Sequence, residues 1–450
     1  MMNSTKACNV FASRLFGYNT GKVLHIKNNK VGFLNRAIQL AIIGYVLFYV
    51  IIYKKGYQSV DVGLSSVVTK VKGTAFTNLS IQFPIKIGNE SKPNILFDGP
   101  RNWDSSDYVI PHQENDVVFI MTNMIITPRQ QQGTCPELDE YEDAKCQNDT
   151  HCVANKPIDN GHGVMTGRCV KPDRPPFVND AEKPNVCEIY AWCPVEYDQL
   201  PMPGTNFGHR LNSSEYLLKE AIDFTILVKN SVLFPAFGVR VRNINDHENE
   251  TYLRQCTYGK IGTNGIKDRL CPIFKLQNIF DEIHDTTFSD AAIKGGVVGI
   301  NIKWDCDFDF GVRNCQPYYS FLGIKDPIDD PNVQIAKGYN FRFARFDVEN
   351  NTQYRTLIKA YGIRFVILVD AKARKFDIVP LLRNLGAGLA LLSLATIICD
   401  FCVVNLSKKK RFYREKIYEY VDGSEPNTNE MRVDSHNDPF LYRALSTVLC

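Results

Sequence analysis

The chain has 450 residues, of which 22% are charged and 44% hydrophobic, an ordinary composition for folded globular protein. Its net charge of +3 is too small to indicate a nucleic-acid partner, and we expect none. The distribution of charged and apolar residues along the chain is more informative than their totals.

The N-terminal region combines a basic segment with a long apolar run. Residues 1–36 contain six Lys or Arg and no acidic residue, and residues 37–53 are uncharged. As a helix, that run is roughly 25 Å long, or about 34 Å with "VGFLN" and a snorkelling Arg36. A buried core helix is the alternative. We predict a cytoplasmic segment at 1–32 and a first transmembrane helix at 33–53, which is also the targeting anchor because no signal-peptide run precedes residue 30.

The stretch "SSVVTKVKGTAF", residues 65–76, alternates like a β-strand. The alternation places the ammonium groups of Lys70 and Lys72 on one face of the pleat. Two solvated lysines on an exposed face would explain this pattern as well as half of an anion site does, so the stretch alone leaves both interpretations open.

Ten of the 14 cysteines lie within residues 54–377. An even number without a CxxC pair in this region favours five disulfides over zinc, and disulfides favour an extracellular location. Six of them crowd into residues 135–193 among many Pro, Gly, Asp and Asn, which predicts a disulfide-stapled, strand-poor head subdomain.

Other runs in this region are short, apolar and bounded by turn residues, as strands are. We therefore predict a membrane protein with two transmembrane helices and a large, mainly antiparallel β, disulfide-rich ectodomain at 54–377, α+β overall. Six N-x-[ST] sequons in the ectodomain are candidate glycosylation sites. They are Asn78, Asn89, Asn148, Asn212, Asn249 and Asn350.

A second apolar segment occupies residues 378–406 and is followed by "SKKKRFYREK". Basic residues flank the N-terminal side of the first span and the C-terminal side of the second, so both termini should be cytoplasmic, with a tail at 407–450.

The second span has one small or polar face at helical spacing, formed by Gly386, Ala390, Ser393, Ile397 and Asp400. Small faces allow close helix approach, and an intramembrane acid normally faces a bundle interior or water. We predict that this face lines a pore built from several subunits. Helix packing without conduction is the alternative.

Further cations lie near the C-terminal end of the ectodomain. "KGYNFRFARFD" alternates so that Asn340 and Arg342 share a face, and "TLIKAYGIRF" contains Lys359. Lysine, arginine and amide groups are the donors that a polyphosphate needs. No GxxxxGK[ST] loop is present, so we expect binding without phosphoryl transfer and no catalytic residue.

Taken together, "YNTGKVLHIKNNKVGFLNR", "KKGYQ", "TKVKG", "DFTILVKN", "NFR", "GIRF" and "NLGAGLALLSLAT" resemble the ATP-gated P2X (ionotropic purinergic) receptors, which are trimeric cation channels. The resemblance covers nearly the whole chain. It implies that ATP binds at each subunit interface, between Lys70, Lys72 and Thr225 of one chain and Asn340, Arg342 and Lys359 of its neighbour.

The resemblance also implies the disulfide pairing and the gate. The pairs would be Cys135 with Cys193, Cys146 with Cys169, Cys152 with Cys187, Cys256 with Cys271, and Cys306 with Cys315. The gate would involve Asn384, Leu385, Ala387, Ala390 and Leu394. Asp223 replaces the asparagine that usually precedes Phe-Thr in the family and adds negative charge near the proposed site.

The function so implied is an ATP-gated, non-selective channel for sodium, potassium and calcium ions in the plasma membrane. It would be a homotrimer, with heterotrimers allowed, and would not hydrolyse ATP. No cofactor or resident metal is expected, since ATP is an agonist, with or without a bound divalent cation. Partners would be ATP, further subunits, the lipid bilayer and permeating cations.

Three rival classes share some of these features. Amiloride-sensitive and acid-sensing sodium channels also have two spans and a cysteine-rich ectodomain, but they do not need Lys70, Lys72 or Arg342. A two-span scavenger or adhesion receptor would conduct nothing. An ectonucleotidase would need a metal-carboxylate cluster or a nucleophile motif, and the sequence offers neither.

Overall fold

The structure is a computed structural model that describes residues 29–78, 81–87, 90–97, 99–111, 114–172, 184–196, 198, 215–244, 250–261, 268–324, 338–407 and 410–417. The chain divides into two compact units. One is the ectodomain, Gln58–Asp377, and the other combines Met1–Tyr57 with Ile378–Cys450. Most of the predicted N-terminal segment and of the predicted tail lies outside the described residues.

The second unit is helical. Among the described residues, two helices are long and apolar enough to cross a membrane, Asn29–Tyr53 with 25 residues and Ile378–Leu406 with 29. The first consists of α2 (Asn29–Gly44) and the π-helical η1 (Tyr45–Tyr53), and the second of α7 (Ile378–Phe401) and the π-helical η7 (Cys402–Leu406). A short helix, α8 (Lys410–Ile417), follows.

The described part of the first helix begins at Asn29, four residues before the span that the apolar residues predict. A helix and its membrane-spanning part need not share their ends, because helical backbone hydrogen bonds also extend through polar residues. Within this unit the two helices pack closely where Gly388 meets Val46, because a Cβ on Gly388 would lie 2.9 Å from Val46 Cγ1.

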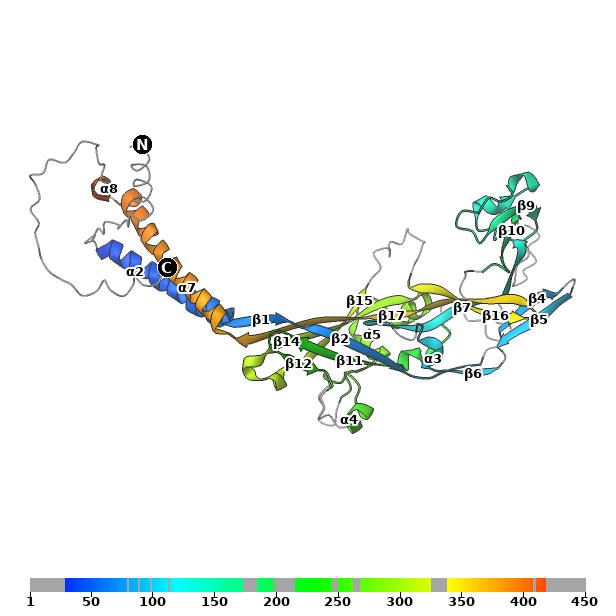
Figure 1. The fold of residues 1–450 in the computed structure, drawn as a ribbon, viewed down its shortest axis with the longest axis horizontal. Coiled ribbons are helices and arrows are strands. Elements are labelled where there is room, and N and C mark those ends of the chain that lie inside the picture. The colour runs from blue at the N-terminus through cyan, green and yellow to red at the C-terminus, as the bar shows by residue number, and fades with distance from the viewer. Residues whose placement is uncertain are drawn as a thin grey trace, which may run out of the picture. The chain divides into compact units, whose positions relative to one another are not determined.

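The ectodomain is mainly strand. Its central element is β17 (Thr352–Phe376), 25 residues long. This strand pairs in parallel with β14 (Gly296–Asp307) and antiparallel with β7 (Val117–Pro136), β1 (Gln58–Val62) and β16 (Asn340–Glu349) (Figure 1). The apolar run "YGIRFVILV" suits a strand in the middle of a sheet, where both faces are covered.

We call the sheet around β17 the large sheet; it also contains β15 (Pro317–Ile324), β10 (Asn185–Cys193), β9 (Val164–Val170) and β8 (Lys145–Cys146). The small sheet consists of β12 (Val239–Arg242), β11 (Thr225–Phe234), β13 (Ile273–Lys275) and β2 (Leu64–Lys72). Two hairpin-like pairs are β3 (Ala75–Asn78) with β6 (Pro100–Trp103), and β4 (Ile81–Ile87) with β5 (Glu90–Phe97).

Short helices complete the ectodomain. The α-helices are α3 (Ser105–Tyr108), α4 (Glu250–Gln255), α5 (Leu276–Glu282) and α6 (Phe288–Lys294). The 3-10 turns are η2 (Glu142–Ala144), η3 (Asp149–His151), η4 (Lys219–Asp223), η5 (Phe308–Phe310) and η6 (Val312–Asn314). The pattern agrees with the predicted mainly antiparallel β ectodomain, with the pairing of β14 and β17 as a parallel exception.

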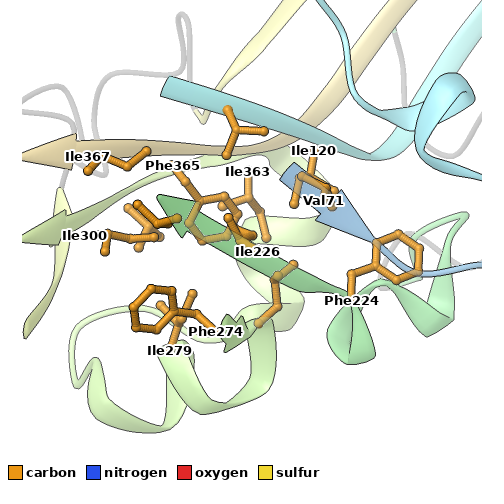
Figure 2. Packing of buried hydrophobic residues seen from close by; sticks show 14 of the residues in the cluster. Val71, Ile120, Phe224, Ile226, Phe274, Ile279, Ile300, Ile363, Phe365 and Ile367 are labelled. Carbon is orange, nitrogen blue, oxygen red and sulfur yellow. The ribbon is translucent and has the colours of Figure 1, made fainter. Parts of the chain in front are cut away.

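The main core lies between the inner faces of the two sheets. Figure 2 shows Val71 and Ile226 of the small sheet close to Ile363 and Phe365 of β17, and all four are buried. Because side chains alternate along a strand, filling this core with every second residue of β2 and β11 turns the intervening residues outward.

The head subdomain, residues 135–193, contains more strand than its composition predicted. The prediction of a strand-poor head is wrong: β8, β9 and β10 lie within it, and β10 pairs with both β9 and β7. The many turn residues hid these strands. The structure joins Cys146 to Cys169 and Cys152 to Cys187 around a small core of its own, so cross-links and strand pairing hold the head together.

Candidate functional site

The first group of predicted site residues lies on the small sheet. Val71 is only 9% exposed and faces the core, which turns Lys70 and Lys72 of β2 outward. Thr225 of β11 lies directly opposite Lys72, and its hydroxyl donates to the carbonyl oxygen of Lys72 at 3.3 Å. Within the part of the chain that the structure describes, neither ammonium group has an ion-pair partner.

The register of β2 against β11 decides which face the lysines occupy. The buried Asn230 amide donates to Ser65 Oγ at 2.8 Å, and it accepts from Trp304 Nε1 of the large sheet at 2.7 Å. A slip by one residue would turn the lysines toward the core. These buried hydrogen bonds therefore help to keep both lysines on the solvent side.

A third cation, not predicted from the sequence, lies on this face. Lys229 lies on β11 opposite Val68, is exposed, and alternates with buried neighbours in the same phase as Thr225. The alternation of "DFTILVKN" would have predicted that Lys229 faces outward together with Thr225. The outward face of β2 and β11 is therefore more cationic than the sequence analysis predicted.

Directly after β2, the backbone of Gly73 lies against the ring of Phe224, the residue before Thr225. A Cβ on Gly73 would lie 2.2 Å from the Phe224 ring, so only glycine fits there. Tyr108 stacks on the Phe224 ring and donates its hydroxyl to the carbonyl oxygen of Gly73. Asp223, the departure from the family pattern, forms an ion pair with Lys275 at 2.7 Å, so its charge has a partner within the chain.

The second group lies on the large sheet. Arg342 of β16 is directly opposite Lys359 of β17, and Asn340 is opposite Tyr361, so the four side chains share one face of this strand pair. Just before β16, the backbone at Gly338 lies very close to the backbone at Lys294. A Cβ on Gly338 would lie 2.1 Å from the Lys294 carbonyl oxygen, and the φ of Gly338 is +77°, so glycine is required there.

Two carboxylates of the same chain bind the cations of the second group. Arg342 Nε lies 2.5 Å from Glu196 Oε2, and Arg342 Nη2 lies 2.8 Å from Asp198 Oδ2. The Lys359 ammonium group, whose side chain is 9% exposed, also binds Asp198, and the Tyr361 hydroxyl donates to Asp198 at 3.1 Å. Neither acid was predicted from the sequence.

The electrostatics follow from this clustering. Burial acts to raise the pKa of Asp198, but the hydrogen bond and charge of Lys359 and the charge of Arg342 outweigh it, so the pKa lies below its ordinary value. Burial and the nearby Asp198 raise the pKa of Tyr361. The cluster therefore holds an ionised carboxylate where another anion with several oxygens could bind instead.

The six predicted residues thus form two groups in one chain. The structure brings Lys70 and Lys72 together with Thr225 on the small sheet, and Asn340 and Arg342 together with Lys359 on the large sheet. Each group is a set of cations and polar donors that suits phosphate oxygens.

The predicted gate residues lie on α7. Asn384 donates from its amide to the carbonyl oxygen of Gly56 at 2.6 Å, within the helical unit. The residues that α7 buries lie on another face of the helix, formed by Gly388, Ala395 and Cys399. The remaining gate residues are exposed in the single chain: Leu385, Ala387, Ala390 and Leu394. The predicted pore face is also exposed, and it consists of Gly386, Ala390, Ser393, Ile397 and Asp400.

Three candidate glycosylation sites lie in the described part of the chain. Asn78 ends β3, Asn148 caps η3, and Asn350 lies in the turn between β16 and β17 with φ +48°; all three are exposed. The candidates Asn89, Asn212 and Asn249 lie outside the described residues.

The described residues form five disulfides, and their partners are those that the resemblance implied. The pairs are Cys135–Cys193, Cys146–Cys169, Cys152–Cys187, Cys256–Cys271 and Cys306–Cys315.

Both histidines of the head have partners within the protein. His162 Nδ1 lies 2.8 Å from Glu137 Oε1, and His151 Nδ1 accepts a hydrogen bond from the backbone N–H of Gln147 at 3.4 Å.

The fold and these two cationic groups define a class: a two-span membrane receptor whose β-rich, disulfide-bonded ectodomain presents anion-binding side chains. Comparison with known proteins agrees. A family model described as "ATP P2X receptor" matches residues 16–420. The chain is 43% identical to P2X purinoceptor 4 of Mus musculus, over 93% of this chain and 97% of that protein, and 40% identical to P2X purinoceptor 5 of Homo sapiens, over 94% and 86%.

Solved structures are also similar. An invertebrate P2X receptor from the Gulf Coast tick, determined in the presence of ATP and Zn²⁺ ion, superposes with a TM-score of 0.67 at 41% identity, covering 82% of this chain and 99% of that one. The chicken ATP-gated P2X7 receptor channel, with the competitive antagonist TNP-ATP, gives 0.62 at 32% identity over 82% and 98%. This chain belongs to the P2X receptor family of ion channels, which separates it from the rival classes considered above.

Proposed function

We propose that this chain is an extracellular-ATP-gated, non-selective cation channel of the plasma membrane, with both termini cytoplasmic, which binds ATP without hydrolysing it. One observation carries the proposal: the two cationic groups lie on different sheets, so a ligand that joins them needs a surface from each. A polyphosphate fits, because several oxygens on one short chain can bind lysines of one group and the arginine of the other.

Three subunits would complete three such sites. Lys70, Lys72 and Thr225 of one subunit would face Asn340 and Arg342 of the next, together with its Lys359. Thr225 would read the adenine with nearby backbone atoms, and the cations would hold the phosphates. Self-association also suits α7, since its small and polar face is exposed in the single chain, and three copies of that face would line a pore.

Gating would follow from competition and from differential affinity. The phosphates of ATP would displace the carboxylates of Glu196 and Asp198 from Arg342 and Lys359, which exchanges one set of charge-assisted hydrogen bonds for another. ATP favours opening only by the extent to which it binds the open arrangement more tightly than the closed one. Permeation of sodium, potassium and calcium ions would then follow through the pore.

Whole-cell patch clamp of cells expressing the full chain, with ATP and a panel of other nucleotides applied outside, tests the proposal. We expect an inward cation current with ATP, and a weaker response to nucleotides with fewer phosphates. Surface labelling in the same cells is the control. If the chain reaches the surface and millimolar ATP produces no current, the proposal is wrong.

A further inference from the structure

The turn between β14 and β15 presents apolar side chains to solvent. We call residues 308–314, which comprise η5 and η6, the η5–η6 turn. The side chain of Phe310 is 71% exposed and that of Val312 is 43% exposed. Single exposed apolar residues are common, but two neighbours on one short turn at a defined place in the fold point to a contact surface.

The place is the end of the ectodomain at which the chain enters and leaves the spans. Gln58, the first residue of β1, donates from Nε2 to Asp307 at 2.9 Å and to Asp309 at 2.7 Å. Phe376, the last residue of β17, donates its backbone N–H to Asp309 at 2.6 Å. Along the chain, only Asp377 separates Phe376 from the second span, so the turn is hydrogen-bonded to the two strand ends that lead into the spans.

The base of the turn is rigidly held. The Cys306–Cys315 disulfide closes it, and Phe308 is buried with its ring 5.5 Å from that of Phe234 and 5.8 Å from that of Phe237. The tip is therefore pre-organised, and it loses little conformational entropy when it contacts another surface.

The acidic and the basic side chains of the turn and its flank have different surroundings. The carboxylates of Asp307 and Asp309 accept hydrogen bonds from the strand ends, while Phe310, Val312 and Arg313 are exposed. Aromatic and aliphatic groups beside a cation suit the membrane interface, where the apolar groups reach the acyl boundary and arginine meets lipid phosphates.

We propose that the η5–η6 turn is a lipid contact of the ectodomain, with Phe310 and Val312 in the interface of the outer leaflet and Arg313 at the phosphate groups. The turn would hold the ends of β1 and β17 against the membrane surface. The contact needs no agonist, so it is independent of the proposed ATP gating.

The test uses the full chain in phosphatidylcholine vesicles with Phe310→Trp as a fluorescent reporter. We compare plain vesicles with vesicles that contain lipid spin-labelled near the headgroup. Phe76→Trp is the matched control, since Phe76 is 59% exposed and lies on β3, which pairs with β6 rather than with the strand ends. The unsubstituted chain, with its three tryptophans, supplies the background.

We expect spin-labelled lipid to reduce the Phe310→Trp signal and to leave the Phe76→Trp signal at background. Equal signals from Phe310→Trp in both vesicles would overturn the proposal. The proposal would also be overturned if labelled lipid left the Phe310→Trp fluorescence unchanged while dissociation of the oligomer shifted it. The turn would then contact a second copy of the chain. Should Phe310→Trp misfold, as judged by size-exclusion chromatography, Val312→Trp serves as the reporter with the same expected loss.

Discussion

Arg342 on β16 lies directly opposite Lys359 on β17, and the carboxylate of Asp198 binds both cations. The pair is thus a preformed anion site whose occupant in the single chain is an acid of the same chain. Lys70 and Lys72 on the small sheet have no such occupant among the described residues. The two halves of the proposed ATP site therefore differ: one is open to solvent, and the other must exchange partners.

The first prediction concerns the cations themselves. Lys70→Ala and Arg342→Ala should each raise the ATP concentration for half-maximal current by about tenfold or more, because a lost charge-assisted contact costs about 1.5–3 kcal/mol. Lys303→Ala, an exposed lysine on β14, is the control and should change little. Unchanged ATP sensitivity in both site variants, with normal surface expression, would contradict the site.

Arg342→Ala needs a further control, because it leaves the Glu196 carboxylate, with a side chain 3% exposed, without its ion pair. A buried unpaired charge destabilises the fold in its own right. The double variant Arg342→Ala with Glu196→Gln removes that penalty. Its surface expression should recover, while its ATP sensitivity should stay low if Arg342 binds phosphate.

The second prediction concerns the competing acid. Asp198→Asn should lower the ATP concentration for half-maximal current by about fivefold, since an amide holds Lys359 and Arg342 about 1 kcal/mol less tightly than a carboxylate does. Glu349→Gln is matched to it, because Glu349 ends β16 and pairs with Arg129 at 2.7 Å outside the site. An increase in the required ATP concentration for Asp198→Asn would mean that Asp198 supports binding rather than opposing it.

The third prediction concerns the packing of the two spans. Gly388→Ala should destabilise the helical unit by about 1–3 kcal/mol, because the new methyl group would lie 2.9 Å from Val46 Cγ1. Gly44→Ala is the control: Gly44 ends α2, outside the proposed pore face, and nothing lies within 4 Å of its Cβ position, so the change should be neutral or stabilising by up to about 1 kcal/mol. Thermal unfolding in detergent measures both.

Val46→Ala removes the methyl groups that the new side chain would strike. The double variant with Gly388→Ala should therefore be more stable than the sum of the two single effects predicts. Simple additivity would show that the two helices do not meet at this point.

The fourth prediction concerns the disulfides. The Cys135–Cys193 bond closes 58 residues and the Cys256–Cys271 bond closes 15. Replacing each pair by serine should cost about 2–5 kcal/mol, with the longer loop costing roughly 1 kcal/mol more from chain entropy. Chemical denaturation of the full chain in detergent measures both losses. A larger loss from the shorter loop would contradict the entropic argument.

The fifth prediction concerns acid stability of the head. Burial acts to raise the pKa of Glu137, but hydrogen bonds from His162 and from the Leu138 amide outweigh it, so the pKa lies below its ordinary 4.5. A depressed carboxyl pKa contributes stability that is complete above 4.5 and is lost as pH falls through the lower folded value.

Glu137→Gln should therefore cost about 1–3 kcal/mol at neutral pH, since His162 loses its charged acceptor, and should weaken the loss of stability below pH 4.5. Glu142→Gln is the control in the same subdomain, because Glu142 is exposed and its ion pair among the described residues is with the nearby Lys145. Identical acid profiles for the parent and Glu137→Gln would show that Glu137 does not carry this dependence.

Much of the fold could be predicted from local patterns. The apolar run of residues 37–53, the alternation through Lys70 and Lys72, and the even cysteine number each report a physical demand of the local environment. The strands of the head escaped prediction because turn residues surround them and their pairing is not local: β10 pairs with β7, and β8 and β9 pair with β10. The described helix that contains the first predicted span begins at Asn29, before the apolar residues, because a helix does not end where hydrophobicity does.

The sequence by itself determined the two apolar spans, the strand alternation and the types of side chain available for an anion, since these depend on residues close together in the chain. Only the tertiary structure decided which of them meet. Strand pairing placed Lys359 opposite Arg342 and put Lys229 on the same face as Lys70, and the folded chain brought the unpredicted Asp198 onto both cations of the second group. Asp198 is 144 positions from Arg342 and 161 from Lys359, so a local pattern carries no information about these contacts.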